Sequence, residues 1–258
     1  MSEVAFLRAV VGAEWFKIRS VRSTVWTLGL AFALSAGLGT LIALNFRSGI
    51  DRVENFDPLF AGLISLMLGQ LALVVFGVLV IGSEYGSGTI RASLAAVPRR
   101  GAFFGGKVLA CALTAFPVSV VMVAVTFTAT QTALGPYGTT AGADEVLPGL
   151  VGACVYLTLI CLFALGVATM LRSSALALGI LLPLLFLGSQ GLGNVPKLKT
   201  VLQFLPDQAG MELMGLVGPS DDPQFAHVYG PWGALAILLA WTAAALVGGY
   251  VTLNRRDA

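Results

Sequence analysis

Charged side chains are scarce in this chain. Only 11% of its 258 residues are Asp, Glu, Lys or Arg, while 57% are hydrophobic and the mean hydropathy is +0.89. A soluble globular domain carries about 25% charged residues, so an ordinary soluble enzyme is excluded. The composition also excludes a disordered chain, and the net charge of +2 is too small for a protein that binds nucleic acid. What remains is a membrane protein that crosses the bilayer several times.

Residue types that build catalytic and metal sites are also few. The chain has one histidine, His227, and three cysteines, which lie within apolar runs. The apolar runs hold no paired carboxylates, His pair or Cys–His pair that could activate a nucleophile or bind a metal. An intramembrane enzyme is therefore disfavoured. We expect no catalytic, cofactor-binding or metal-binding residue.

One glycine-rich stretch, Gly101–Lys107, fits most of the pattern of a phosphate-binding loop. Val108 stands where that pattern needs a Ser or Thr to hold magnesium, and no strand precedes the stretch. We therefore expect that this chain does not bind ATP itself.

Six runs that lack Asp, Glu, Lys and Arg are long enough to cross a bilayer, which takes about 20 apolar residues. The expected fold is an all-α polytopic membrane protein that forms a single transmembrane domain over residues 1–258. Its six transmembrane helices are expected at residues 23–46, 58–83, 108–133, 147–171, 173–194 and 231–253.

The distribution of basic residues predicts the orientation of these spans. With six spans both termini lie on one side, and that side carries 11 of the Lys and Arg residues against 4 on the other. Basic residues favour the cytoplasmic side. We therefore expect both termini in the cytoplasm.

The first 22 residues show a helical pattern. Val4, Leu7, Val11, Trp15 and Ile18 recur every three or four residues and so share one helix face. The charged residues, Glu14 among them, are expected elsewhere on the helix. This pattern is typical of an amphipathic helix in the cytoplasmic interface, and a polar tail with chance periodicity is the alternative.

The polar segment at residues 84–107 separates the second and third spans. Two glycines end the span, Thr89 can cap a short helix, and a proline stops that helix before a basic end. Its apolar side consists of Ile90, Leu94 and Val97. The segment is either a short cytoplasmic helix that docks into a soluble partner or only a basic loop.

The segment at residues 195–230 contains two apolar stretches that are too short to cross the bilayer. They predict two short helices that dip into the outer leaflet or lie on it, and a plain extracytoplasmic loop is the alternative.

Polar residues inside the spans are uncharged, and no carboxylate lies near a span centre, which argues against ion-coupled transport. Hydrogen bonding between helices is the favoured explanation for them, and the lining of a substrate path is the alternative. The candidates for such a path are Gln70, Thr126, Thr130, Ser189, Gln190 and Asn194. Small residues at four-residue steps, such as Gly29, Ala33 and Gly37, would permit close helix contact.

Three stretches, in their order among the spans, resemble the permease subunits of bacterial ABC-2-type export transporters. The first begins at Glu14 and ends at Trp26, and the third is Leu205-Pro206-x-x-Ala209-Gly210. The second is Gly82-x-Glu84-Tyr85-x-x-Gly88-Thr89-Ile90-Arg91-x-x-Leu94, with Pro98, Arg99, Arg100 and Lys107 after it.

The resemblance implies a permease in the bacterial cytoplasmic membrane. It would work as a pair, with a second copy or a homologous permease, beside separate ATPase subunits that bind ATP and magnesium. Its substrate would be an antibiotic, a lipid or another amphiphile, moved outward. The lipid bilayer is an expected partner and nucleic acid is not. A scaffold or assembly factor that transports nothing is the main alternative.

The resemblance also assigns roles to segments. The 84–107 segment would be the coupling helix that receives the motion of the ATPase, the N-terminal helix would flank it, and the 195–230 segment would close the exit. The coupling residues would be Glu84, Tyr85, Thr89, Ile90, Arg91, Leu94, Pro98, Arg99 and Arg100. The residues of the interfacial helix would be Trp15, Lys17, Arg19 and Arg22.

Overall fold

The structure is a computed structural model that describes residues 3–20, 22–49, 56–144, 146–189, 199–217 and 227–255. Helices dominate these ranges, which contain no strand. They are α1 (Glu3–Ser20), α2 (Arg22–Phe32), a π-helical turn (Ala33–Gly37), α3 (Leu38–Gly49), α4 (Pro58–Leu63), α5 (Leu66–Ser87), α6 (Ile90–Ala96), α7 (Arg100–Leu134), a 3-10 turn (Gly135–Tyr137), α8 (Val146–Leu171), α9 (Ser174–Ser189), α10 (Lys199–Leu202), α11 (Pro206–Leu213) and α12 (Pro231–Arg255).

Five helical stretches of the described chain are long and apolar enough to cross a membrane. They are Trp26–Gly49, Pro58–Ser87, Arg100–Tyr137, Val146–Leu171 and Pro231–Arg255. The multi-pass helical architecture is therefore confirmed. The sixth expected span, at residues 173–194, corresponds to α9, which has 16 residues and ends where the described part of the chain stops. The count of six therefore stays a prediction.

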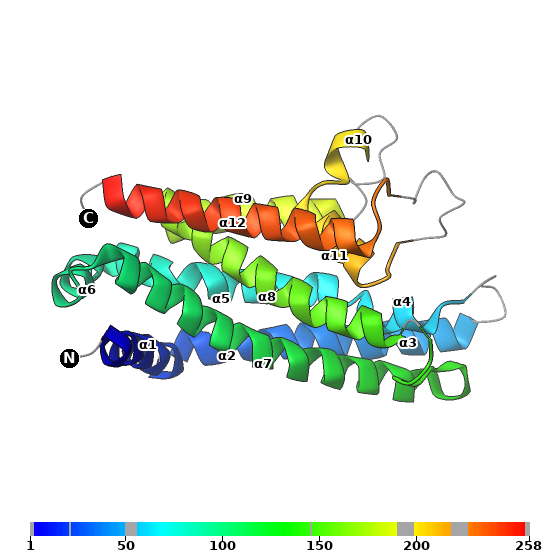
Figure 1. The fold of residues 1–258 in the computed structure, drawn as a ribbon. Coiled ribbons are helices and arrows are strands. Elements are labelled where there is room, and N and C mark those ends of the chain that lie inside the picture. The colour runs from blue at the N-terminus through cyan, green and yellow to red at the C-terminus, as the bar shows by residue number, and fades with distance from the viewer. Residues whose placement is uncertain are drawn as a thin grey trace.

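The long helices run side by side, with α8 at the centre of the contacts (Figure 1). It packs against α5, α7, α9 and α12. Its fully buried side chains include Tyr156, Leu157 and Leu165. Because α8 is apolar on all sides, it can occupy the interior while its neighbours face lipid.

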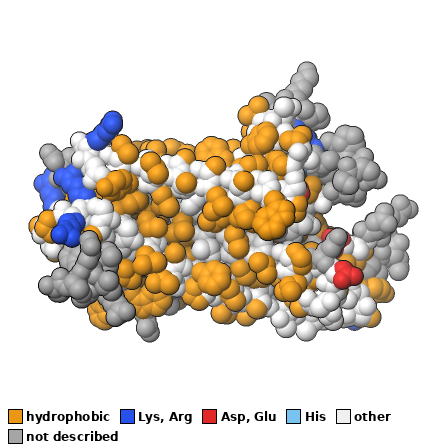
Figure 2. Space-filling view, viewed as in Figure 1, with side chains coloured by type: hydrophobic (Ala, Val, Ile, Leu, Met, Phe, Trp, Pro, Cys, Tyr) orange, Lys and Arg blue, Asp and Glu red, His pale blue; other side chains and the backbone are white. Residues whose placement is uncertain are grey.

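Both described ends of the chain and α6 lie at one end of the bundle, and α10 and α11 lie at the other (Figure 1). In the face shown, Lys and Arg side chains gather at the end with α6, and acidic side chains appear at the opposite end (Figure 2). Helix α1 is seen almost end-on while the long helices run across the view, so α1 crosses them (Figure 1).

The first two spans pack closely against each other through serine and glycine residues. Ser35 lies in the π-helical turn of the first span and is fully buried; a Cβ added to Gly69 of α5 would overlap its Oγ. Conversely, a Cβ added to Gly39 would come within 2.7 Å of Ser65 Oγ, at the turn between α4 and α5. Both spans thus carry a Ser-x-x-x-Gly pattern. The two patterns run in opposite directions, so the serine of each span meets the glycine of the other. Small residues at this spacing let helix backbones approach closely.

The small residues singled out from the sequence do not make this contact. Gly29, Ala33 and Gly37 lie on the exposed side of the first span. Nothing lies within 4 Å of a Cβ built at either glycine. The contact is made by a second series of small residues at the same four-residue step, Ala31, Ser35 and Gly39, which are buried.

Helix α7 begins at Arg100, whereas the sequence placed the start of the third span at residue 108. The stretch Gly101–Lys107 is helical, so it does not form a phosphate-binding loop. The polar segment expected over residues 84–107 is therefore divided between the end of α5, the short helix α6 and the first turns of α7.

Candidate functional site: the coupling end

Helix α6 is positioned by the way in which α5 ends. Gly88 has a φ of 72°, a left-handed conformation that glycine adopts at little cost, and it terminates α5 after Ser87. The chain turns there and α6 starts at Ile90. Thr89 occupies the N-cap position, but its side chain does not cap the helix; its hydroxyl lies 2.9 Å from Ser87 Oγ instead.

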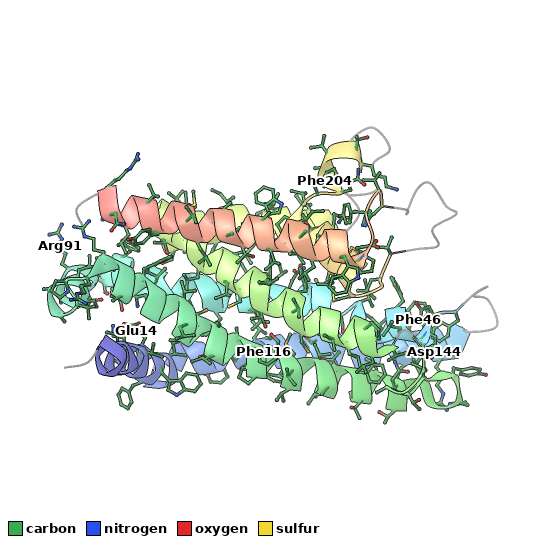
Figure 3. The ribbon with its side chains drawn as sticks, viewed as in Figure 1. Glu14, Phe46, Arg91, Phe116, Asp144 and Phe204 are labelled. Carbon is green, nitrogen blue, oxygen red and sulfur yellow. The ribbon has the colours of Figure 1, made fainter. Side chains whose placement is uncertain are left out.

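One side of α6 rests on the bundle and the other is exposed. Ile90 is buried, and Leu94 and Val97 pack against the same apolar core. On the outer side Arg91, Ala92 and Ala95 are exposed, and Arg91 extends from the end of the bundle (Figure 3). The helix ends at Ala96, because Pro98 holds the residue before it in a non-helical conformation.

At the same end of the bundle as α6 (Figure 3), four charged side chains from three helices meet. Lys107 of α7 is fully buried; its Nζ donates to Glu14 Oε2 of α1 at 2.6 Å and to Glu84 Oε1 of α5 at 2.8 Å. The ammonium group also lies 5.1 Å from the centre of the Phe103 ring, one turn earlier on α7. We call Glu14, Lys17, Glu84 and Lys107 the charge cluster.

Lys17 closes the charge cluster at its rim. Its Nζ lies 2.8 Å from Glu14 Oε1 and 2.9 Å from Glu84 Oε1, and 45% of its side chain remains exposed. Burial lowers the pKa of Lys17, but its hydrogen bonds to Glu14 and Glu84 outweigh that effect, so the pKa lies above its usual value. Lys17 therefore carries its charge at any physiological pH.

The charge cluster contains two positive and two negative side chains. A buried ion pair adds little net stability over a well-packed apolar core, but the loss of one partner leaves a buried charge and costs about 3–5 kcal/mol. The cluster therefore makes the relative positions of α1, α5 and α7 hard to change independently. One oxygen, Glu84 Oε2, has no hydrogen-bond partner among the described residues.

Several predicted coupling residues make contacts within this chain. Glu84 is buried against Lys107 and Lys17, so its charge partners belong to the bundle and not to a docked protein. Tyr85 lies under the Arg172 guanidinium, 5.4 Å from ring centre to Cζ, at the turn between α8 and α9.

Arg99 and Arg100 differ in their surroundings. Arg99 is exposed. Arg100 Nη1 donates to the backbone oxygens of Leu253 at 2.7 Å and Asn254 at 3.0 Å, at the C-terminal end of α12. A cation there satisfies carbonyl groups that have no partner within the helix. Arg100 therefore connects the start of α7 to the end of α12.

The N-terminal segment forms a helix, α1, as its periodicity predicts, but the buried face differs from the expected one. Val10, Glu14 and Ile18 are buried, whereas Val11 and Trp15 are only half-buried. Glu14 lies on this buried face because Lys107 of α7 stands opposite to it. Arg19 and Arg22 have side chains outside the described set.

The described side chains among the residues proposed for a substrate path are fully buried. Gln70 is buried; it donates to Met67 O at 2.9 Å and accepts a hydrogen bond from Tyr156 Oη. Thr126 and Thr130 are buried on α7, and Thr130 Oγ1 bonds to backbone oxygens of its own helix. Ser189 ends α9, its side chain lies outside the described set, and so do Gln190 and Asn194.

Sequence reasoning placed Lys107 in the polar segment before the third span and missed its burial, and it also missed the buried position of Glu14. A lysine seven residues inside an apolar helix is a signal, since burial of an unpaired charge is costly and predicts a carboxylate partner. In the described ranges no group of three His, Cys, Asp or Glu side chains could hold a metal ion.

These features define a class: a polytopic α-helical membrane protein that carries a short exposed helix at the end of its bundle. A family model described as "ABC-2 family transporter protein" matches residues 11–258. The chain therefore belongs to the ABC-2 transporter family, and it is a membrane transport subunit that is not itself an enzyme. Permeases of this family normally work with ABC ATPases. No curated protein matches the chain.

Proposed function

We propose that this chain is the transmembrane subunit of an ATP-driven exporter, which pairs with a second permease and with ATPase subunits on separate chains. Both termini and α6 would face the cytoplasm, as the distribution of Lys and Arg predicts. The substrate would be an antibiotic, a lipid or another amphiphile that moves outward.

The single observation that carries the proposal is the position of α6. The helix is held outside the long spans by Gly88, it rests on the core through Ile90, and it leaves Arg91 and Ala95 exposed. A soluble ATPase that docks on this side would reach the bundle through a short, stiff element. The charge cluster would then transmit the movement of α6 to α1 and α7, because α5 leads directly into α6 and Glu84 of α5 is bonded to residues of α1 and α7.

The proposal is tested by purifying the tagged, full-length chain from membranes of its native host in mild detergent. We expect a complex of two permeases and two ATPases by native mass spectrometry, with ATP hydrolysis that vanadate inhibits. Ala95→Trp, on the exposed side of α6, should remove the ATPase from the complex because a bulky ring would obstruct docking.

Ala141→Trp is the matched control, since Ala141 is also exposed but lies in the turn at the other end of the bundle. It should retain the ATPase. A well-folded chain that purifies without any ATPase and without ATP hydrolysis would contradict the proposal and favour a scaffold. Equal ATPase content in both variants would show that α6 is not the docking element.

A further inference from the structure

A carboxyl group is buried at the end of the bundle opposite to α6. Asp207, in the first turn of α11, is fully buried. Its Oδ2 accepts a hydrogen bond from Gln208 Nε2 at 3.0 Å, whereas its Oδ1 has no partner among the described residues. A buried carboxylate that lacks a partner is costly, and such a group favours its neutral, protonated form.

Helix α11 is packed closely against its neighbours. It packs against α8, α9 and α12. Gly210 lies directly on the ring of Tyr156, so that an added Cβ would overlap the ring. Further along, a Cβ on Gly149 of α8 would come within 2.9 Å of Met214 O. Tyr156 in turn donates to Gln70 of α5. The position of α11 is thereby linked to α8 and α5.

Among the residues that the structure describes, the titratable groups near Asp207 offer it no positive charge. Tyr156 faces it from α8, and Tyr229 faces it from the segment before α12. Glu212 of its own helix lies 3.1 Å from His227 Nδ1. Helix α9 has no titratable residue, and those of α12, Tyr250 and Arg255, lie near its far end.

The direction of the pKa shift agrees with this geometry. Burial raises the pKa of Asp207 to about 6. Burial, with the negative charges of Glu212 and Asp207, also raises the pKa of Tyr229. Near neutral pH the carboxyl group of Asp207 is therefore ionised, although its buried site favours the protonated form.

We propose that Asp207 is a proton-binding site that controls the packing of α11: the protonated acid holds α11 against α8, and the carboxylate loosens it. The neutral acid can stay buried without a cation, whereas the carboxylate gains hydration only if α11 moves away from Tyr156. The ligand is the proton itself, and the inference does not depend on an ATPase partner.

The test is amide hydrogen exchange of the full-length protein in lipid nanodiscs at pH 5.0 and pH 7.5. Rates are converted to protection factors, which removes the pH dependence of the chemical step. In the wild type we expect protection of residues 206–213 to be at least tenfold higher at pH 5.0. In Asp207→Asn it should be high at both values, because the amide is neutral. Asp144→Asn removes an exposed acid at the same end of the bundle and should behave as the wild type.

His227 contacts Glu212, which lies on the same helix as Asp207, so His227→Gln separates that contact from Asp207. The pH dependence should persist in His227→Gln. If the pH dependence of protection disappears in His227→Gln and remains in Asp207→Asn, the proposal is overturned. A wild type whose protection of α11 is equal at both pH values would also overturn it, and that measurement remains decisive if Asp207→Asn does not fold.

Discussion

Removal of Lys107 should destabilise the protein far more than removal of Lys17. Both lysines contact the same two carboxylates, but Lys107 is fully buried while 45% of the Lys17 side chain is exposed. Lys107→Met keeps the length of the side chain and removes its charge. Glu14 and Glu84 would then share only the cation at the rim, and two buried negative charges would face each other.

The expected cost follows from the burial. Loss of one member of a buried ion pair costs about 3–5 kcal/mol. For a chain of this size that corresponds to a fall of roughly 10 °C in the unfolding temperature. Lys17→Met, the matched control, should cost under about 1 kcal/mol because solvent screens its half-exposed charge. The assay is thermal unfolding in nanodiscs, followed by intrinsic fluorescence.

A compensated variant tests the electrostatic argument itself. Lys107→Met combined with Glu14→Gln and Glu84→Gln carries no charge in the buried part of the cluster. It should recover most of the stability that Lys107→Met loses, since the uncompensated carboxylates are gone. If both single lysine variants lose the same small amount, or if the triple variant is no more stable than Lys107→Met, the reasoning is refuted.

Three further predictions address packing, pH and topology. Gly69→Ala should cost about 1–3 kcal/mol by overpacking on the serine of the first span, whereas Gly29→Ala, where the added Cβ meets nothing within 4 Å, should cost little in the same unfolding assay. Because the folded pKa of Asp207 is about 6 and the ordinary value is 3.8, its ionisation lowers stability by about 3 kcal/mol above pH 6, and that loss is regained as pH falls toward 3.8. Asp207→Asn should therefore unfold at a higher temperature than the wild type at pH 8, and at the same temperature near pH 4. In a variant without the three native cysteines, a cysteine at Ser48 should react with an impermeant thiol reagent added to intact cells and one at Ser87 should not; the opposite result would invert the topology.

Hydropathy was sufficient to predict the helical class and the positions of five long apolar helices, because the bilayer requires continuous apolar runs of about 20 residues. The family followed from a few polar and glycine residues between those runs. Gly88, for example, ends α5 because glycine readily adopts a left-handed conformation, and a glycine at this position can be recognised in the sequence. The sixth span stays a prediction.

The contacts between helices were less accessible from the sequence. Periodicity placed Glu14 away from the apolar face of the first helix, but tertiary packing buries it because Lys107 faces it from 93 residues along the chain. The first span likewise has two series of small residues at four-residue steps, and packing selects Ala31, Ser35 and Gly39 over Gly29, Ala33 and Gly37. A regular helical count cannot predict either feature, since both depend on residues that are distant in sequence.

The proposed docking of an ATPase on α6 is the central claim, and crosslinking in living cells tests it most directly. A photo-reactive benzophenone amino acid is placed at Ala95 on the exposed side of α6, or at Ala141 as the control at the other end of the bundle. After illumination of the native host we expect a covalent adduct at Ala95 that contains an ABC ATPase, and none at Ala141. An ATPase adduct at Ala141, or its absence at Ala95 in cells where the chain is active in transport, would contradict the account.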